Sequence, residues 1–297
     1  MSLIEQALAR RASISSPDTT IVRLIDGSGD GFPGITLDQF GEHFLISSAG
    51  PPVPADLKKW AQGSGRSVYF KKLDQKEKDS PTLLSGPPVD GTFIARENGL
   101  SFELSFSSGY SQGIFPDQRL NRAQVISRST AGNTVLNTFA YTGAFSVCAA
   151  SSGATATTLD LSQPYLQWGR RNMQLNGISP DSHFFCKGDT FHWLGRFARQ
   201  GRSFDGIILD PPTFARDHKG KVFRIEKDYG RLTELALDCL APGGWLLACT
   251  NYRQMSTKDF ERVISSSCKA RARIRSAEMP PEYTADAYLK SVWLELQ

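Results

Sequence analysis

The fold is decided by residues 134–177, TVLNTFAYTGAFSVCAASSGATATTLDLSQPYLQWGRRNMQLNG. Two short runs within it, 134–138 and 154–159, predict buried strands because each is brief and bounded by turn residues. Helical patterns follow both runs. Strands that alternate with helices form right-handed βαβ units, and such units build a parallel sheet. The stretch therefore predicts an α/β fold.

The helix after the second run has a clear period. Its expected inner face is formed by Leu161, Tyr165, Trp168, Asn172 and Leu175. These positions are spaced at i, i+4, i+7, i+11 and i+14, and Gly177 follows as a helix-ending glycine. The spacing predicts an amphipathic helix packed on the sheet.

The same rhythm continues to the end of the chain. The seven expected strands are Thr134–Thr138, Ala154–Leu159, Ser182–Cys186, Asp205–Leu209, Gly244–Cys249, Arg271–Ala277 and Lys290–Leu296. The last strand has no helix after it, so we expect it to be inserted antiparallel into a mostly parallel sheet. Ligands bind such doubly wound, Rossmann-like sheets at the carboxyl ends of the strands.

The residues before position 107 have a different pattern. Short alternating runs and turn signals predict a small α+β domain over 1–107, followed by the larger domain over 108–297. The expected elements are strands at Thr20–Ile25, Ile35–Phe40, His43–Ser47, Ser67–Lys71, Thr92–Ala95 and Leu100–Phe106, and a helix at Ala55–Gln62.

Composition points to a globular protein of the cytoplasm. Of the 297 residues 40% are hydrophobic and 22% charged, and the net charge is +4. No apolar run approaches the ~18 residues that span a bilayer, and the first residues lack the apolar core of a secretory signal. The five cysteines form no CxxC pair, which argues against disulfides and for a reducing compartment. Neither a membrane partner nor an oligomeric state is indicated.

The loop after the first expected strand, 137–145, contains a single glycine, Gly143. A dinucleotide requires several glycines for its pyrophosphate. One glycine suits a cofactor without pyrophosphate, and the alternative is an ordinary strand-to-helix turn.

Aspartates follow the next two strands. Asp160, 17 residues beyond Gly143, is spaced to accept hydrogen bonds from two ribose hydroxyls. Gly188 lets a ring approach the backbone, and Asp189 can accept from an exocyclic amine. The alternative for both aspartates is a helix N-cap. For the helix after Asp160, the cap is either Asp160 or Ser162.

The fourth strand ends in Asp210-Pro211-Pro212-Thr213-Phe214. Two prolines cannot continue a strand, so they form a stiff turn that presents the aspartate to a pocket. A hinge loop is the alternative. Four such features in order, at successive strand ends, favour a cofactor site. The four scattered histidines give no metal-ligand spacing.

Several motifs resemble one known family. Residues 111–122, SQGIFPDQRLNR, look like the Q-[ST]-G-x-F-x-D-x-R signature of S-adenosylmethionine-dependent methyltransferases that modify large-subunit ribosomal RNA. VLNTFAYTGAFSV, TTLDLSQPYLQWGRRNMQLNGI, DGIILDPPTFAR and LAPGGWLLACTN match the same family in order. The resemblance covers roughly residues 19–297, and it implies a class I methyltransferase fold.

The resemblance also implies roles for individual residues. Asp160 would hold the ribose of S-adenosylmethionine and Asp189 its adenine, while Asp117 and Arg119 would shape the methionine end of the pocket. The expected cofactor-binding set is Phe115, Asp117, Arg119, Asn137, Phe139, Tyr141, Gly143, Asp160, Leu161, Gly188, Asp189 and Asp210. Asp210, Pro211, Pro212 and Asn251 are the expected catalytic residues beside the target base.

Two departures from the family bear on the target. The cytosine-C5 members open with an RNA-binding module, which we do not expect in this chain. They also carry a nucleophilic cysteine where this sequence has Asn251, and the guanine-N7 members are more similar there. A ring nitrogen has a free lone pair, whereas cytosine C5 needs a thiolate. Asn251 therefore favours guanine N7 over cytosine C5. Cys249 lies nearby, and its pattern favours core packing over a nucleophile.

The resemblance implies an RNA partner, 23S rRNA or another structured RNA, and two clusters of basic residues are in keeping with it. One cluster follows the D-P-P turn, and another lies near the end of the chain. The clusters are Arg216, Lys219, Lys221, Arg224, Lys227 and Arg231, and then Lys269, Arg271, Arg273 and Arg275. A solvated surface is the alternative. Two other functions stay open: a non-catalytic RNA-binding protein with this fold, and a methyltransferase for proteins or small molecules.

Overall fold

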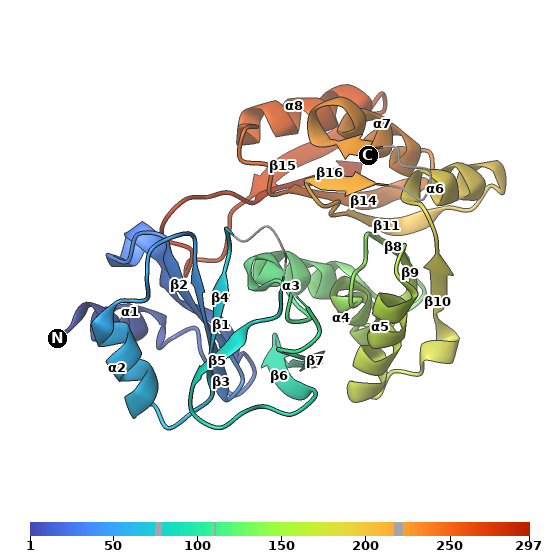
Figure 1. Ribbon diagram of the computed structural model, residues 1–297. Coiled ribbons are helices and arrows are strands. Elements are labelled where there is room, and N and C mark those ends of the chain that lie inside the picture. The colour runs from blue at the N-terminus through green and yellow to red at the C-terminus, as the bar shows by residue number, and fades with distance from the viewer. Residues whose placement is uncertain (75–78, 110, 217–221) are drawn as a thin grey trace. The chain divides into compact units, whose positions relative to one another are not determined.

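The chain forms two compact units in a computed structural model (Figure 1). The residues that the structure describes are 1–74, 79–109, 111–216 and 222–297. The first unit comprises Met1–Arg119 and Pro280–Ala287, and the second comprises Leu120–Met279 and Tyr288–Gln297. This division differs from the expected boundary at residue 107, because the first unit continues to Arg119 and takes back a late segment.

The second unit is built on a seven-stranded sheet of order β10-β9-β8-β11-β14-β16-β15. The strands are β8 (Thr134–Thr138), β9 (Thr155–Asp160), β10 (Phe184–Lys187), β11 (Phe204–Leu209), β14 (Leu240–Thr250), β15 (Ala272–Ala277) and β16 (Lys290–Leu296). The strands from β10 to β14 in this order pair in parallel, and β16 is antiparallel to both β14 and β15. The expected mostly parallel α/β sheet is confirmed, as is the antiparallel insertion of the last strand.

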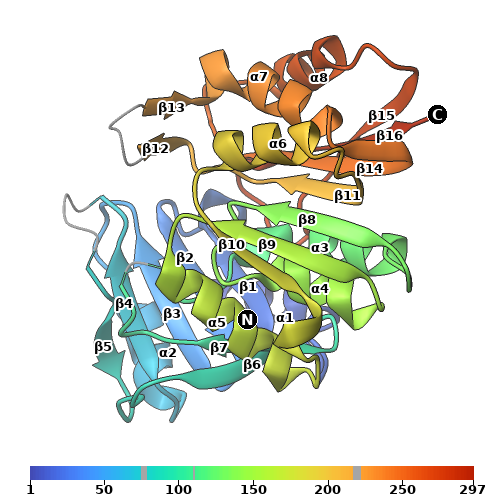
Figure 2. The ribbon, with the colours of Figure 1, turned by 90° about the vertical axis from the view of Figure 1, so that its right-hand side faces the viewer.

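Helices cover both faces of this sheet, with α3, α4 and α5 on one face and α6, α7 and α8 on the other (Figure 2). The helices are α3 (Arg119–Arg128), α4 (Ala144–Ser151), α5 (Gln163–Leu175), α6 (Thr190–Arg199), α7 (Ile225–Leu237) and α8 (Thr257–Ser267). A short 3-10 turn, η3 (Pro180–Ser182), precedes β10, and β12 (Phe214–Arg216) pairs with β13 (Val222–Arg224). Ser182, expected to begin a strand, belongs to η3.

The inner face expected for α5 is only partly correct. Trp168 and Asn172 are buried, whereas Leu161 and Leu175 are exposed. The helix begins later than expected, at Gln163, and it packs through Leu166 and Met173 as well. The inner face expected from Leu161 onward is therefore turned partly toward solvent.

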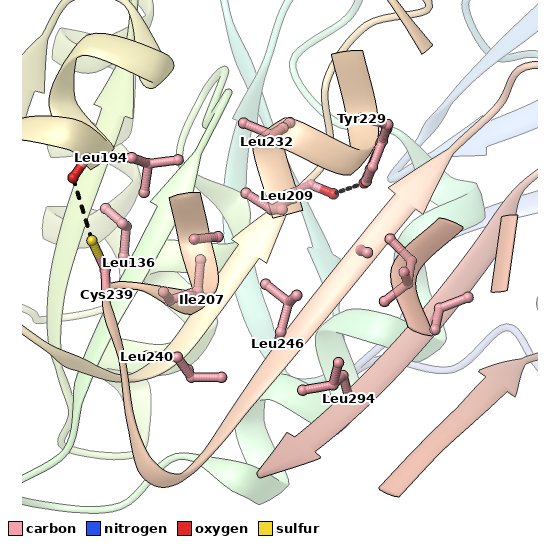
Figure 3. Packing of buried hydrophobic residues seen from close by; sticks show 14 of the residues in the cluster. Leu136, Leu194, Ile207, Leu209, Tyr229, Leu232, Cys239, Leu240, Leu246 and Leu294 are labelled. Atoms are coloured by element: carbon pink, nitrogen blue, oxygen red, sulfur yellow. Dashed lines mark hydrogen bonds between the residues drawn. The ribbon is translucent and has the colours of Figure 1, made fainter. Parts of the chain in front are cut away.

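The core beneath α6, α7 and α8 consists mainly of aliphatic side chains from the central strands (Figure 3). Ile207, Leu209, Leu246 and Leu294 are fully buried. Burying one such side chain contributes about 1.5–3 kcal/mol. Polar atoms within this core are paired: the thiol of Cys239 donates to the carbonyl of Leu194 over 3.4 Å. This packing holds the carboxyl ends of β11 and β14 in place.

The first unit is α+β, as expected. Its five-stranded sheet has the order β1-β2-β3-β4-β5. The strands are β1 (Ile21–Asp26), β2 (Ile35–Phe40), β3 (His43–Ser48), β4 (Val68–Lys72) and β5 (Thr82–Ser85), with a separate hairpin of β6 (Phe93–Glu97) and β7 (Leu100–Leu104). The helices are α1 (Leu3–Arg11) and α2 (Ala55–Gly63), with 3-10 turns η1 (Gly27–Asp30) and η2 (Pro116–Gln118).

A buried ion pair joins the returning segment, residues 280–287, to the rest of the first unit. Arg11 binds Asp30 through two hydrogen bonds of 2.6 and 2.7 Å, and both side chains are almost fully buried. The same guanidinium donates to the main-chain carbonyl of Glu282 over 2.8 Å. The carboxylate of Asp26 accepts from the backbone N–H of Ala285, also over 2.8 Å. The first unit is thus built from two segments that lie far apart in the sequence.

Candidate active site

The candidate site lies in the second unit, where the parallel strands end together. Thr138 pairs with Leu159 on one side and with Leu209 on the other, and Lys187 pairs with Asp160. Because parallel strands end at the same edge, this register brings the loops after β8, β9, β10, β11 and β14 to one edge of the sheet. The loops carry most of the residues predicted from the sequence.

The loop between β8 and α4 is folded with three left-handed residues. Phe139 has φ 51°, Tyr141 has φ 50° and Gly143 has φ 74°. Positive φ costs energy in a residue with a side chain, and such strain gathers at ligand-binding sites. Gly143 has a packing role as well, because a Cβ atom there would lie 3.2 Å from Cα of Gly169 in α5. The single glycine therefore permits both the turn and the close approach of a helix.

Asp160 is fixed by this loop and by the start of the next one. Its Oδ2 accepts from the N–H of Tyr141 and its Oδ1 from the N–H of Ser162, each over 2.8 Å. Burial raises the pKa of the carboxyl group, although the backbone donors oppose this shift. The N-cap of α5 is Ser162. Each carboxylate oxygen has a second lone pair, so the pair can accept two hydroxyl groups side by side.

Asp189 and Gly188 lie beside Asp160. Asp189 is the N-cap of α6, and its Oδ1 accepts from the N–H of His192 over 2.9 Å. The N–H of Gly188 donates to the carbonyl of Asp160 over 3.0 Å. A Cβ at Gly188 would lie 2.6 Å from the indole nitrogen of Trp193, so this ring already requires a glycine. Next to Asp160, the side chain of Leu161 is 43% exposed and offers an apolar surface.

Asn137 lies beneath the loop, within the packed interior. Its side chain is 1% exposed, and its amide donates to Oγ of Ser146 over 3.0 Å. Thr158 donates to the same oxygen over 2.9 Å. Asn137 thus connects β8 with α4 and, through Ser146, with β9. Its expected contact with the cofactor stays a prediction.

Three expected cofactor-binding residues belong to the first unit. Arg119 forms an ion pair with Glu282 at 2.7 Å. Asp117 lies in η2, and the ring of Phe115 directly before it is 48% exposed. The structure assigns these residues to a different unit from Asp160 and Asp189. Their role at the methionine end stays a prediction.

The D-P-P turn and Asn251, expected from separate motifs, are joined by a hydrogen bond. The hydroxyl of Thr213, directly after Pro212, donates to Oδ1 of Asn251. Asn251 is exposed just beyond β14, and Asp210 is half-buried just beyond β11. The bond engages Oδ1 of the amide and leaves its Nδ2 as a donor. Sequence reasoning missed Thr213, although it is part of the quoted D-P-P-T-F motif.

Tyr229 holds together the strand ends that carry these two motifs. It lies in α7 and is fully buried, and its hydroxyl donates to the carbonyl of Leu209 at 3.0 Å (Figure 3). The same hydroxyl reaches the carbonyl of Cys249 at 2.8 Å. Burial raises the pKa of the phenol well above its usual value, so the hydroxyl stays a donor. Leu209 directly precedes Asp210. The one available signal was a tyrosine on the apolar face of a helix, where its hydroxyl requires a partner.

Cys249 is a core residue. Its side chain is 0% exposed, and its thiol donates to Oγ of Ser291 over 3.6 Å. The amide of Asn121 also points at this sulfur, at 3.8 Å. Asn251, by contrast, lies beyond Thr250, where the strand ends. A thiol packed in this way is placed as a structural residue.

The two basic clusters expose most of their described side chains. In the first, Lys219 and Lys221 lie outside the described residues, while Arg224, Lys227 and Arg231 are exposed. In the second, all four basic side chains are exposed along or beside β15. Within the described ranges there is no group of three metal-ligating side chains that could hold an ion. No helix in the described part of the chain is long and apolar enough to cross a membrane.

Known proteins match nearly the whole chain. A family model of S-adenosylmethionine-dependent methyltransferases matches residues 54–291. A ribosomal RNA large subunit methyltransferase of Deinococcus radiodurans is 31% identical over 320 residues, covering 99% of this chain and 78% of the relative. Ribosomal RNA large subunit methyltransferase I of Aeromonas salmonicida is 31% identical over 273 residues, covering 87% and 68%. The crystal structure of the methyltransferase SMU.776 complexed with SAH has a TM-score of 0.88 at 29% identity, covering 99% of this chain and 80% of the other.

Proposed function

Because the chain belongs to the family of S-adenosylmethionine-dependent methyltransferases, we propose that it methylates a base of large-subunit ribosomal RNA, 23S rRNA in bacteria. The observation that carries the proposal is the pairing of two sites at one sheet edge. The Asp160 carboxylate fits a ribose, and the Thr213–Asn251 bond borders the place for a base. A ribosomal substrate implies the cytoplasm, in keeping with five free cysteines.

The residues around Asp160 suit S-adenosylmethionine. Asp160 would accept from both ribose hydroxyls, and the exposed side chain of Leu161 would pack on the nucleoside. One oxygen of Asp189 caps α6, and the other can accept from the adenine amine. The cofactor supplies an electrophilic methyl group on a sulfonium. The protein's contribution is therefore alignment of the acceptor and exclusion of water.

On the acceptor side, the chain's residues position a base. The turn from Asp210 to Pro212 is stiff, and Asn251 is oriented by Thr213. Asn251 can donate and accept along a base edge. Guanine N7 already carries a lone pair, so this arrangement is sufficient for transfer to it. Cytosine C5 requires a thiolate, and the nearby Cys249 is buried. We therefore propose guanine N7 as the target.

The test is transfer of a labelled methyl group to 23S rRNA from a strain that lacks this protein, followed by nucleoside analysis. The expected product is 7-methylguanosine. Cys249→Ser should stay within about tenfold of the wild-type rate, because the thiol plays no chemical part. Asn251→Ala should lose more, through misplacement of the base.

Other products would redirect the proposal. A 5-methylcytidine product, or a covalent adduct with 5-fluorocytidine RNA, would replace guanine N7 by cytosine C5 and make Cys249 the catalyst. Binding of the cofactor without transfer to any RNA would favour a protein or small-molecule substrate. Failure to bind the cofactor would leave a non-catalytic RNA-binding protein.

A further inference from the structure

We propose that the basic residues along β15 and just before it form a second RNA-binding surface, which holds rRNA flanking the target nucleotide. The inference rests on the proposed function. The surface, here called the β15 basic stripe, consists of Lys269, Arg271, Arg273 and Arg275, which are all exposed. The strand forms one edge of the seven-stranded sheet (Figure 2).

Three of these arginines share one face of the sheet. Successive side chains in a strand alternate between faces, so positions 271, 273 and 275 point the same way. Ile274, between them, packs into the core on the other face, and Ser276 donates to Glu261 of α8 there. The arginines therefore point away from α8.

The arginine face has an excess of positive charge. Arg273 lies opposite Glu295 of β16, and Arg128 of α3 binds this same carboxylate at 2.6 Å. Arg128, followed by Arg275 and Arg273, lowers the pKa of Glu295. The carboxylate of Glu295 is thus already paired. Within the described part of the chain, the three stripe arginines form no ion pair of their own.

The stripe leads away from the catalytic edge. β15 runs in the same direction as β14, because both are antiparallel to β16. Arg275 is level with Leu247, since both pair with Trp293, and Ala277 is level with Cys249. Two strand spacings of ~4.8 Å separate β15 from β14, or about 10 Å. RNA that enters the site beside Asn251 could continue along these side chains.

The simplest alternative is protection of an open sheet edge, because charged side chains prevent edge-to-edge pairing. Either positive or negative charge protects a sheet edge. A polyanion requires positive charge, and arginine in particular matches phosphate oxygens with two parallel donors. The two explanations therefore respond differently to charge reversal.

The experiment compares three triple variants in binding to unmethylated 23S rRNA at several salt concentrations. In the first, Arg271, Arg273 and Arg275 become Gln, and in the second they become Glu. The matched control replaces Arg196, Arg199 and Lys258 by Gln, which removes the same positive charge. These exposed residues lie on α6 and α8, on the face of the sheet opposite the arginines. Cofactor affinity and sedimentation are measured for each variant.

Each phosphate contact contributes about 0.7–0.9 to the slope of log affinity against log salt. The Gln triple should therefore reduce the slope by up to about 2–3. The Glu triple should reduce binding further, while the control and the cofactor affinities stay near wild type. The proposal is overturned if the Glu triple binds RNA as wild type does, or if the control loses as much slope as the Gln triple.

These outcomes separate the inference from the proposed function. Wild-type protein that binds rRNA through the stripe but methylates none of it would refute the function alone. Methylation of rRNA with an unchanged salt slope in both stripe variants would refute the stripe alone.

Discussion

Tyr229→Phe removes one hydroxyl from the point where β11 and β14 end. The ring is retained, including its edge-on contact with Phe260 at a centroid distance of 4.8 Å. Lost with the hydroxyl is one shared proton, donated at 3.0 and 2.8 Å to the carbonyls of Leu209 and Cys249. Removing a donor from buried acceptors costs about 1–3 kcal/mol. We expect a loss of this size in the free energy of unfolding.

The effect on catalysis should be larger than the loss of stability implies. The two carbonyls directly precede Asp210 and Thr250, so a small shift of the strand ends moves the D-P-P turn relative to Asn251. Misplacement by roughly 1 Å can cost about 100-fold in rate. We therefore expect kcat to fall between about ten- and one-hundredfold. KM for the cofactor should change little, because Asp160 and Asp189 follow other strands.

Urea unfolding, calorimetry with S-adenosylmethionine and the kinetics of methyl transfer measure these three effects. Thr233→Ala is the matched control, because its buried hydroxyl bonds within α7, to the carbonyl of Tyr229 at 2.9 Å, and does not touch the strand ends. It should lower stability with kcat preserved. If both variants lose kcat equally, or if Tyr229→Phe keeps full activity, Tyr229 does not position the turn.

Three further predictions concern other sites. Asp160→Ala should weaken calorimetric binding of S-adenosylmethionine by ~1–3 kcal/mol, and unchanged affinity in a folded variant would reject the ribose assignment. Asp30→Ala leaves the buried Arg11 uncompensated, so chemical denaturation should show a loss of about 3–5 kcal/mol; Arg10→Gln, which changes a half-exposed partner of the same carboxylate, should cost far less. Burial lowers the pKa of Lys71 from 10.5 to about 8, so between these values the unfolded chain holds a proton that the folded chain lacks. Stability should rise with pH across this interval, and Lys71→Met should remove the rise.

Local patterns predicted most of the second unit. The ranges of β8 and β16 agree with expectation to the residue, because short apolar runs between clear turn signals have little freedom. Strand order and the edge that carries Asp160 follow from the general rules of parallel sheets. α1 was missed although Ser2 and Glu5 form a capping box, a signal that local sequence does contain.

The features that the sequence did not predict depend on contacts between distant residues. Nothing in the neighbourhood of Tyr229 indicates that its hydroxyl bridges two strands, and the Thr213–Asn251 bond joins positions 38 residues apart. Gly188 is expected to border a ligand, and the indole of Trp193 gives a second reason for a glycine there that the local sequence does not reveal. The inner face of α5 was misplaced because the helix begins at Gln163 and not at Leu161. Such features require the three-dimensional packing.

The returning segment, residues 280–287, has a consequence for how the protein is made. Synthesis proceeds from the N-terminus, and domains usually fold as they emerge from the ribosome. Here Arg11 emerges long before its partner, because the carbonyl that it binds, on Glu282, comes 271 residues later. β16, which separates β14 from β15, follows this segment. A chain cut short before residue 280 therefore leaves both units unfinished, because the first unit lacks its returning segment and the second lacks β16.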